Sequence, residues 1–356
     1  MKISIITIIS TKNFGAILQL YALYIYIKNH LNKQVEVINY RPKSKNKNMK
    51  QFLKNKLQIF LLRGRYYKSE KFLNEMISFT NIKYKNFAEL KEAPPIADIY
   101  IVGSDQVWNS EIYSGLDPAF FLDFISLKRK ISYASSIGKN SVSTEELYQI
   151  KYYLDSFNAI SVRENSAKII LEKNGLKNIY QVLDPVFLLK KEDYLKLSIK
   201  PKEKKYILIY SFEFNEKINE IAQKISKKMN LKIVEIGGAI KKYKSNKFIS
   251  NIGPKEFIGL IEGADFILTT SFHGTAFSLL FNKNFFSALP STRSTRIQSL
   301  ISMLNLNRRV IRNNDKFKVE ELLGPLDYTI INEILESEIE KSKQFLIDKI
   351  NSEKHE

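Results

Sequence analysis

The chain has 356 residues, 44% hydrophobic and 12% aromatic, which is enough for two domains with ordinary buried cores. It contains no cysteine, which excludes disulfides, thiolate metal sites and cysteine nucleophiles and fits a reducing compartment. The formal net charge of +19 favours anionic partners, although lysine is spread over the whole sequence and a general composition bias explains part of the charge.

Short β-branched runs alternate with longer amphipathic segments along the first half, a pattern that predicts an α/β fold with parallel sheets. The apolar start of the chain is too short for a membrane span and has no signal-peptide cleavage site, so we expect a cytoplasmic protein. Helices are predicted over Ala16–Asn29 and after Ser143, which forms a capping signal with Glu146. The strands predicted for a first sheet are Ile3–Ile9, Val35–Asn39, Ile99–Val102, Ile131–Ala134, Ala159–Val162 and Tyr180–Leu183.

A basic stretch from Arg41 to Lys56 follows the second predicted strand. Two interpretations remain open for it: a solvated loop, or a contact with an anionic membrane surface, where each basic residue contributes about 1 kcal/mol. Its lysines are Lys43, Lys45, Lys47, Lys50, Lys54 and Lys56.

The lysine-rich stretch Lys190–Lys205, which contains Pro201, is typical of a linker, and a second sheet follows it. We therefore expect an N-terminal domain over 1–195, a C-terminal domain over 205–310 and a helical tail over 311–356 that packs across their junction. Two facing domains of this kind bring the carboxyl ends of their strands to one cleft, where open α/β sheets bind ligands. The strands predicted here are Tyr206–Ser211, Lys232–Ile236, Phe248–Asn251, Phe266–Thr270 and Phe285–Leu289, and the helices are Asn215–Met229, Lys255–Glu262, Arg296–Leu304 and Asp327–Ile350.

Two polar loops follow strands of the first sheet and are candidates for binding a sugar. Asn13 and Gly15 stand where a helix begins, so backbone N–H groups there are available to an anion or a hydroxyl unless they only cap the helix. The second loop contains the only tryptophan of the chain, Trp108, whose ring is suited to stacking on a sugar, and Asp105, which could bind or deprotonate a hydroxyl. A turn with a buried aromatic plug is the alternative. The other candidates in this loop are Ser104, Gln106 and Asn109.

Arg163 follows another predicted strand, at the start of a helix. Cations are disfavoured at helix N-termini, so its position points to an anionic ligand, for which the planar guanidinium is well suited. A surface salt bridge to Glu164 or Glu172 is the alternative. Asp184, after the last strand of the first sheet, is a candidate or only a turn residue.

The richest loop surrounds His273, where a strand ends in hydroxyl residues and a helix begins. His273 is a better catalytic candidate than His30, near the end of a helix, or His355, in the terminal tail. The start of the helix also offers a backbone site for an anion, although a single histidine is often structural. The candidates for binding an anionic donor here are Ser271, Gly274 and Thr275, with Arg293 and Arg296 in a further loop.

In chain order, these segments resemble the polysaccharide pyruvyltransferase family over most of the chain, up to about Arg309. Each segment alone is weak evidence, because Gly- and Ser-rich loops between strands and helices are widespread, but their ordered recurrence is specific. The matching segments are Asn13-Phe14-Gly15-Ala16 with Leu18-Gln19 and Ala22-Leu23, Val102-Gly103-Ser104-Asp105-Gln106-Val107-Trp108-Asn109, Ile131-Ser132-Tyr133-Ala134-Ser135-Ser136-Ile137-Gly138, Ile160-Ser161-Val162-Arg163-Glu164, Leu183-Asp184-Pro185 and Ser271-Phe272-His273-Gly274-Thr275.

The resemblance implies two facing Rossmann-like domains of the GT-B type, phosphoenolpyruvate as co-substrate, no cofactor and no catalytic metal. The implied product is a pyruvate ketal on a sugar of a bacterial surface polysaccharide, or on its polyprenyl-diphosphate-linked or nucleotide-linked precursor. Arg163 and His273 are carried over by motif as donor-site residues. Some relatives have an arginine where Ser271 stands here, so we expect Arg293 and Arg296, or less favourably Lys12, to hold the donor's second anionic group.

The chemistry of this reaction needs a proton donor for the methylene carbon of the donor, and histidine changes its charge near neutral pH. His273 is the candidate for that role, and Asp105 for orienting the acceptor hydroxyls. Two other functions remain open: a GT-B glycosyltransferase with a nucleotide-sugar donor, and a nucleic-acid or membrane-binding protein selected for its charge. We expect no nucleic-acid partner, because that function accounts for neither His273 nor the Trp108 loop.

Overall fold

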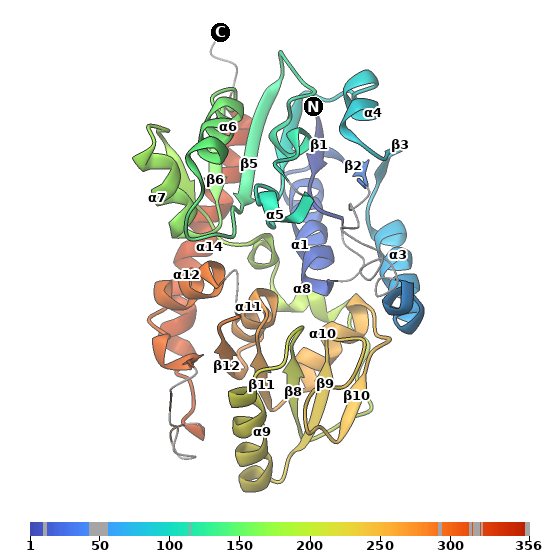
Figure 1. Ribbon diagram of the computed structural model, residues 1–356, viewed down its shortest axis with the longest axis vertical. Helices are drawn as coiled ribbons and strands as arrows, with labels where there is room; N and C mark the ends of the chain where they lie inside the picture. The colour runs from blue at the N-terminus through green and yellow to red at the C-terminus, as the bar shows by residue number, and fades with distance from the viewer. Residues whose placement is uncertain are drawn as a thin grey trace. The chain divides into compact units, whose positions relative to one another are not determined.

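The computed structural model describes residues 1–9, 13–42, 56–113, 115–290, 294–312, 315, 321 and 323–352. It divides into two compact α/β units (Figure 1). Unit 1 comprises residues 1–47, 73–189 and 336–356, and unit 2 comprises residues 48–72 and 190–335. The segment 48–72 thus belongs to unit 2, although the sequence predicted it within an N-terminal domain over 1–195. Lys12, Arg293 and most of the basic stretch, residues 43–55, lie outside the described residues.

Unit 1 contains a seven-stranded sheet in which all neighbouring strands are parallel. Its strands are β1 (Lys2–Ile6), β2 (Gln34–Tyr40), β3 (Phe79–Tyr84), β4 (Ile99–Val102), β5 (Arg129–Ser135), β6 (Ala159–Val162) and β7 (Ile179–Gln181). They lie in the order β3-β2-β1-β4-β5-β6-β7. This is a doubly wound order, and its direction reverses between β1 and β4.

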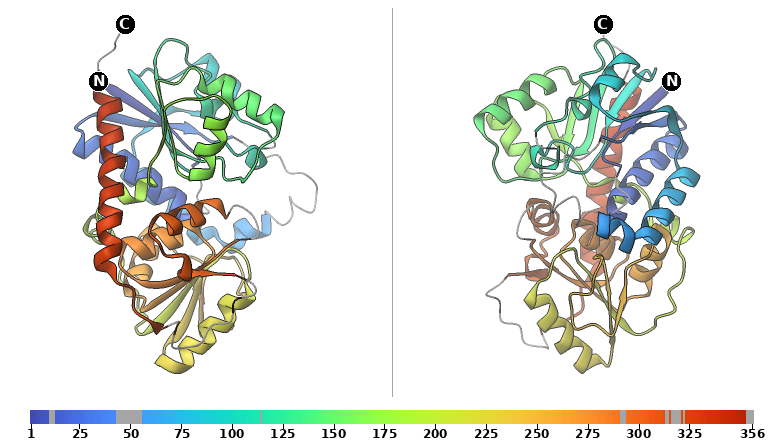
Figure 2. Two further views of the ribbon diagram at one scale, coloured as in Figure 1. Left: turned by 90° about the vertical axis from the view of Figure 1, so that its left-hand side faces the viewer. Right: turned by 45° about the vertical axis from the view of Figure 1, so that its right-hand side comes forward.

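The helices of unit 1, apart from the short α5, bury apolar side chains in its core. They are α1 (Phe14–Ile25), continued by the π-helical turn η1 (Tyr26–His30), then α4 (Phe87–Glu92), α5 (Ser110–Tyr113), α6 (Thr144–Leu154) and α7 (Asn165–Lys173), with the 3-10 turns η2 (Pro118–Phe121) and η3 (Pro185–Leu188). Two further helices, α3 (Arg63–Met76) and α14 (Tyr328–Asn351), have residues in both units. Figure 2 shows α14 as a single unbroken helix. Within unit 1, Phe345 of α14 packs against Tyr133 of β5 and Tyr180 of β7.

Unit 2 contains a six-stranded parallel sheet with the same kind of order, β10-β9-β8-β11-β12-β13. Its direction reverses between β8 and β11, so each unit has its own switch point. The strands are β8 (Tyr206–Tyr210), β9 (Lys232–Ile236), β10 (Lys247–Ile249), β11 (Phe266–Thr269), β12 (Asn284–Ala288) and β13 (Val310–Ile311). The helices are α8 (Lys191–Leu195), α9 (Glu216–Met229), α10 (Pro254–Gly263), α11 (Phe272–Leu280) and α12 (Thr295–Met303), with the 3-10 turn η4 (Asn307–Arg309).

The sequence patterns located most of these elements, because apolar runs and caps are local signals. Ser143 caps α6 by accepting a hydrogen bond from Glu146 N at 3.2 Å, as its spacing predicted. The strands β3 and β13 were missed. β3 lies at the edge of its sheet and exposes three consecutive residues, so its sequence is not a continuous apolar run. β13 has only two residues, which is too short to be recognised as such a run. The predicted linker also contains a helix, α8.

Candidate functional site

The loop after β4 carries Asp105 to the carboxyl edge of the unit 1 sheet, beside its switch point. Asp105 has a φ of +77°, in the left-handed region. Its carbonyl oxygen accepts hydrogen bonds from Val107 N at 2.8 Å and from Ser136 N at 3.0 Å. The second bond joins this loop to the one after β5, which compensates for the backbone strain. Strained backbone held in this way is common at functional sites.

Arg163, at the end of β6, forms a buried ion-pair cluster with two carboxylates. Its guanidinium lies 2.6 Å from Asp184 Oδ2 and 3.5 Å from Asp105 Oδ1, and its side chain is only 2% exposed. Burial by itself lowers the pKa of Arg163, but the neighbouring carboxylates, first that of Asp184 and then that of Asp105, raise it above its ordinary value. The expected direct contact between Arg163 and an anionic donor is therefore corrected: its charge is neutralised inside unit 1.

Glu164, next along the chain, also differs from the prediction. Its Oε1 accepts hydrogen bonds from Ser136 Oγ, Ile137 N and Gly138 N at 2.9, 3.0 and 2.9 Å. A side-chain carboxylate thus occupies the backbone donors of the loop after β5. Glu164 was considered only as a salt-bridge partner of Arg163, because the sequence contains no signal for a carboxylate that binds a loop 26 residues away.

Trp108 does not present its ring to a ligand, so its predicted stacking on a sugar is wrong. The side chain is completely buried. Its indole Nε1 donates to Phe120 O at 3.0 Å, and its ring stacks on Phe121 with centroids 5.7 Å apart. The alternative of a buried aromatic plug is what the structure shows, because the apolar turn η2 closes over the indole.

Most of the other acceptor-side candidates use their polar groups within the protein. Ser104 Oγ donates to Ala134 O at 2.9 Å, and Asn109 Nδ2 donates to Gln106 Oε1 at 2.9 Å. All three side chains are buried, and a sugar contact of Ser104, Gln106 or Asn109 stays a prediction. At the start of α1, Asn13 accepts a hydrogen bond from Gly15 N at 3.0 Å, so Gly15 N is used by the helix cap. Asp105, with 12% of its side chain exposed, remains the acceptor-side candidate.

In unit 2 the loop after β11 builds the start of α11 at the other switch point. Ser271 is the N-cap and accepts a hydrogen bond from Gly274 N at 3.4 Å. A Cβ atom on Gly274 would lie 2.2 Å from Thr269 Oγ1, so only glycine allows α11 to approach β11 this closely. The Thr275 hydroxyl is fully buried and lies 2.7 Å from Ser287 Oγ. Gly274 and Thr275 therefore position the helix, and their contact with the donor stays a prediction.

His273 is the second residue of α11 and is 2% exposed. The ring of Phe272 meets it edge-on, with centroids 5.2 Å apart and an interplanar angle of 81°. The guanidinium of Arg296, in the first turn of α12, lies 5.8 Å from the centroid of the Phe272 ring. Phe272 thus links two donor-side candidates in unit 2, His273 and Arg296, and the Ser271 cap lies two residues before His273.

Arg65 is a buried charge that the sequence analysis missed. Its guanidinium donates to Gly237 O and Ser250 O, both at 2.8 Å, at the carboxyl ends of β9 and β10. Burial raises the pKa of Tyr210, the last residue of β8, and the nearby charge of Arg65 opposes that rise. Arg65 therefore adds positive charge to the switch-point edge of unit 2, from a segment more than 170 residues away in the sequence.

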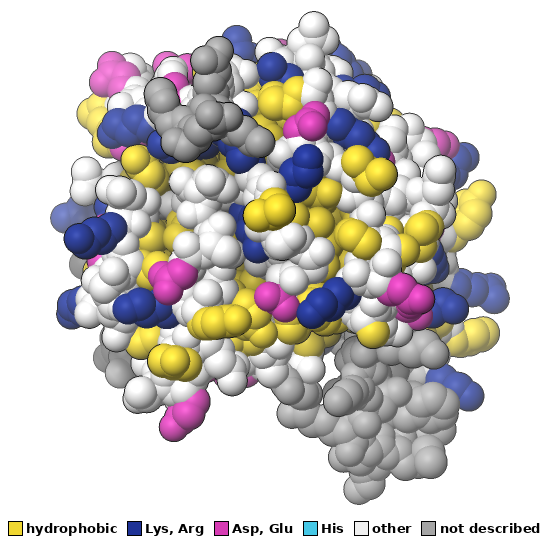
Figure 3. All heavy atoms as spheres, turned by 90° about the horizontal axis from the view of Figure 1, so that it is seen from above, with side chains coloured by type: hydrophobic (Ala, Val, Ile, Leu, Met, Phe, Trp, Pro, Cys, Tyr) yellow, Lys and Arg dark blue, Asp and Glu magenta, His cyan; other side chains and the backbone are white. Residues whose placement is uncertain are grey.

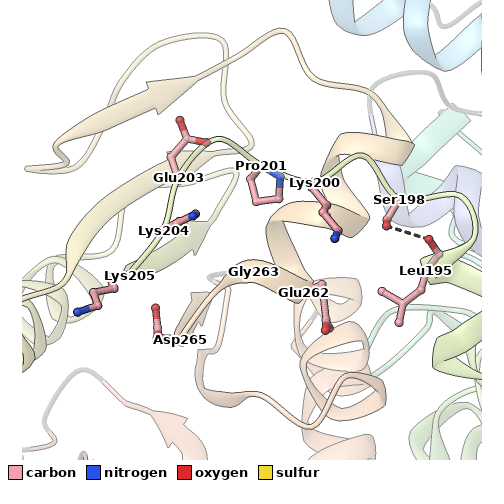
Figure 4. Close-up of a pocket in the computed structure, with 11 residues that line it drawn as sticks. Leu195, Ser198, Lys200, Pro201, Glu203, Lys204, Lys205, Glu262, Gly263 and Asp265 are labelled. Atoms are coloured by element: carbon pink, nitrogen blue, oxygen red, sulfur yellow. Dashed lines mark hydrogen bonds between the residues drawn. The ribbon is translucent and has the colours of Figure 1, made fainter.

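A pocket of about 580 Å³ in unit 2 lies at the opposite edge of the sheet. Lys205 and Asp265, which directly precede β8 and β11, are among its lining residues, together with Pro201 and Glu203 from the predicted linker (Figure 4). Ligands of doubly wound sheets bind at the carboxyl ends of the strands, and this pocket is at the amino ends. Lysine and acidic side chains both line the pocket, so its charge does not favour an anionic ligand over a cationic one. We therefore do not assign the transfer site to it.

Two further observations concern partners. Among the described residues, no group of three or more His, Asp or Glu side chains is arranged to hold a metal ion, and no helix is long and apolar enough to span a bilayer. On the face drawn in Figure 3, Lys and Arg side chains are scattered, with acidic and hydrophobic side chains between them. The positive charge of that face is therefore not gathered into one field of the kind that nucleic-acid binding requires.

A family model described as polysaccharide pyruvyl transferase matches residues 13–291 of the chain. This range includes the strands from β2 to β12, and it contains Asp105, Arg163 and His273. No curated protein matches the chain in sequence.

Solved structures resemble the chain over its full length. A UDP-GlcNAc 2-epimerase from Methanocaldococcus jannaschii, in complex with UDP-GlcNAc and UDP, is 15% identical with a TM-score of 0.53, covering 98% of this chain and 99% of its own. A UDP-GlcNAc 2-epimerase from Neisseria meningitidis, bound to UDP-GlcNAc, is 13% identical with a TM-score of 0.52 and the same coverage. At this identity the likeness establishes the fold alone: an α/β, two-domain, Rossmann-like architecture of the GT-B type, as the sequence predicted.

Proposed function

The chain belongs to the polysaccharide pyruvyl transferase family, and on that premise we propose that it transfers a pyruvyl group from phosphoenolpyruvate to a sugar, forming a ketal and releasing phosphate. The sugar belongs to a bacterial surface polysaccharide or to its lipid-linked or nucleotide-linked precursor. We place the reaction in the cytoplasm. The observation that carries the proposal is the position of His273 at the switch point of unit 2, beside the Ser271 cap and Arg296.

The proposed reaction has two steps. In the first, a sugar hydroxyl adds to the central carbon of the donor, and the methylene carbon takes up a proton to become a methyl group. In the second, a neighbouring hydroxyl attacks the same carbon, and phosphate leaves while the hydroxyl proton is released. His273 supplies the proton in the first step, a role that general acids fill with a contribution of about 10²- to 10⁴-fold in rate.

The charges of the donor also need partners. Arg296 and His273 both contact the ring of Phe272, and we assign Arg296 to the donor's anionic groups. Arg293 stays a prediction, because it lies outside the described residues. The positive end of the α11 dipole adds to this attraction.

Asp105 is proposed to orient the acceptor hydroxyls and to accept a proton from one of them. Arg163 then acts through Asp105, since the ion pair at 3.5 Å holds that carboxylate in place. This assigns Arg163 a positioning role in place of the direct donor contact expected from the family resemblance.

The proposal is tested by incubating the enzyme with phosphoenolpyruvate and candidate sugar acceptors while following phosphate release and the mass of the acceptor. We expect phosphate release that depends on the acceptor and is lost in His273→Asn. A parallel reaction with nucleotide sugars tests the GT-B glycosyltransferase alternative. Nucleotide release with transfer of a sugar, and no pyruvylated product from phosphoenolpyruvate, would overturn the proposal.

A further inference from the structure

A helical segment of unit 2 exposes several large apolar side chains on one face. The chain is helical over residues 56–61 and again in α3, and the bonds from Leu62 N to Gln58 O and from Tyr66 N to Leu62 O, both 3.0 Å, make the two stretches continuous (Figure 1). Leu57, Phe60 and Tyr67 are 60%, 64% and 69% exposed. They are spaced by three and seven residues, so they share one face of the helix, and Ile59 is exposed beside them. Contiguous exposed apolar side chains of this size usually mark an interaction site.

The opposite face of the same segment is fixed to unit 2. Leu62, Arg65 and Ser69 are buried, and Arg65 is held by the carbonyl oxygens of Gly237 and Ser250. Lys68 pairs with Glu256 at the start of α10. The exposed side chains therefore stand on a rigid helix, and they are not the result of a frayed end.

Exposed cations accompany these apolar residues. Lys56 and Arg63 are exposed on the same face, and the guanidinium of Arg63 lies 5.5 Å from the centroid of the Phe60 ring. In the sequence, no acidic residue stands between Glu36 and Glu70. The surface thus combines aliphatic and aromatic side chains with positive charge, and Glu70, at the far end of the same helix face, is its nearest acidic residue along the chain.

We propose that this basic apolar face, formed by Lys56, Leu57, Ile59, Phe60, Arg63 and Tyr67, docks the protein on an anionic lipid bilayer. Interfacial helices bind in this way: apolar side chains enter the boundary of the acyl chains, aromatic rings stay at the level of the headgroups, and cations pair with lipid phosphates. A nucleic acid would use the cations but leave Leu57 and Ile59 without a role. This inference goes beyond the transfer reaction and does not depend on it.

The test is binding of the full-length protein to vesicles of phosphatidylcholine with phosphatidylglycerol, compared with phosphatidylcholine alone, measured by flotation without donor or acceptor. We expect binding only to the anionic vesicles, weakened by salt. Replacing both cations (Lys56→Gln with Arg63→Gln) should weaken binding about 20- to 30-fold, since each basic residue contributes about fivefold near such a surface. The triple variant Leu57→Ser, Phe60→Ser, Tyr67→Ser should lose binding by at least about tenfold through its smaller apolar area.

A matched control is the triple variant Ile96→Ser, Leu127→Ser, Tyr148→Ser, which removes three apolar side chains from unit 1 that are even more exposed, at 84%, 89% and 75%. It should bind as the unchanged protein does, and equal melting temperatures exclude misfolding as the cause of any loss. The proposal is overturned if the unchanged protein does not bind anionic vesicles. The partner of this face would then be a protein or a nucleic acid. The proposal is also overturned if the control triple loses binding as much as the face triple. Because no substrate is present, neither outcome bears on the pyruvyl transfer itself.

Discussion

Single side chains decide where charge is available in the two units. In unit 1 the guanidinium of Arg163 is matched by Asp184 and Asp105, and the carboxylate of Glu164 by backbone N–H groups. In unit 2 Arg296 lies on an aromatic ring next to His273, where it remains partly exposed. The cation of unit 1 is therefore matched by carboxylates inside the protein, and that of unit 2 is the one we propose for the donor.

His273→Asn keeps the size and part of the hydrogen bonding of the side chain but removes its titratable proton. We expect turnover to fall by about 10²- to 10⁴-fold, while the half-saturation concentration of phosphoenolpyruvate changes little. His30→Asn, at an exposed histidine of unit 1, is the control and should keep full activity. Unchanged turnover of His273→Asn at saturating donor would show that His273 is not the proton donor, and a lower melting temperature alone would indicate a packing role.

Arg163→Met leaves two buried carboxylates without their cation. Removing one partner of a buried ion pair lowers the free energy of unfolding by about 3–5 kcal/mol. The double variant Arg163→Met, Asp184→Asn should recover part of this free energy, because it also removes one of the unpaired carboxylates. The single tryptophan, Trp108, lies in the core of unit 1, so its fluorescence during urea unfolding reports on that unit. Lys128→Met, at an exposed lysine of unit 1, is the control and should change the free energy of unfolding by less than about 0.5 kcal/mol. Equal unfolding midpoints for all three variants would contradict the structural role of Arg163.

At the scale of elements, the start of α11 links the hydroxyl residues of β11 to His273. Thr269 Oγ1 donates to Tyr210 O at 2.7 Å and accepts from Ser271 N at 2.9 Å, so the end of β11 is tied both to β8 and to the helix cap. The orientation of His273 depends on this arrangement, because the imidazole follows the cap by two residues.

Gly274→Ala places a methyl group against Thr269, with Oγ1 at 2.2 Å and Cβ at 2.9 Å. We expect overpacking to lower the free energy of unfolding by about 1–3 kcal/mol and to reduce turnover, because the start of α11 must move away from β11. Thermal unfolding and steady-state rates measure the two effects. Gly324→Ala is the matched control, since its nearest contact would be an ordinary 3.6 Å. If Gly274→Ala is as stable and as active as Gly324→Ala, the close helix–strand approach is not needed.

At the scale of the whole molecule, two sheets of the same strand order each place a polar loop beside a switch point: Asp105 after β4 in unit 1 and His273 after β11 in unit 2. Open sheets of this kind bind ligands at such points, because the loops diverge there and leave room above the strand ends. The net charge of +19 favours the approach of anionic substrates to the molecule over long range.

We expect the enzyme to keep its activity in a strong chelator. The donor's two anionic groups are to be met by arginine and by a helix N-terminus, and the chain has no cysteine and only three histidines to form a site for a soft metal. Rates of phosphate release before and after dialysis against the chelator give the measurement. Loss of activity that added magnesium restores would contradict this prediction.

The sequence by itself determined the fold class, most of the strands and helices, and the loops in which the chemistry is to be sought. Apolar periodicity and helix caps depend on residues that are close in the chain, so they can be recognised in the amino-acid sequence. Ser143 before α6 and the strand–helix turn before His273 are examples. The ordered motifs also led to the family.

Only the tertiary structure decided which of the candidate side chains are accessible. Trp108 is closed off by η2, Arg163 is neutralised by Asp184, which comes from another strand end, and Arg65 reaches unit 2 from a segment that the sequence placed in the first domain. Burial and ion pairing join residues 12 to more than 170 positions apart. Such contacts follow from how the whole chain packs, because the free energy of a buried charge depends on partners that no local pattern specifies.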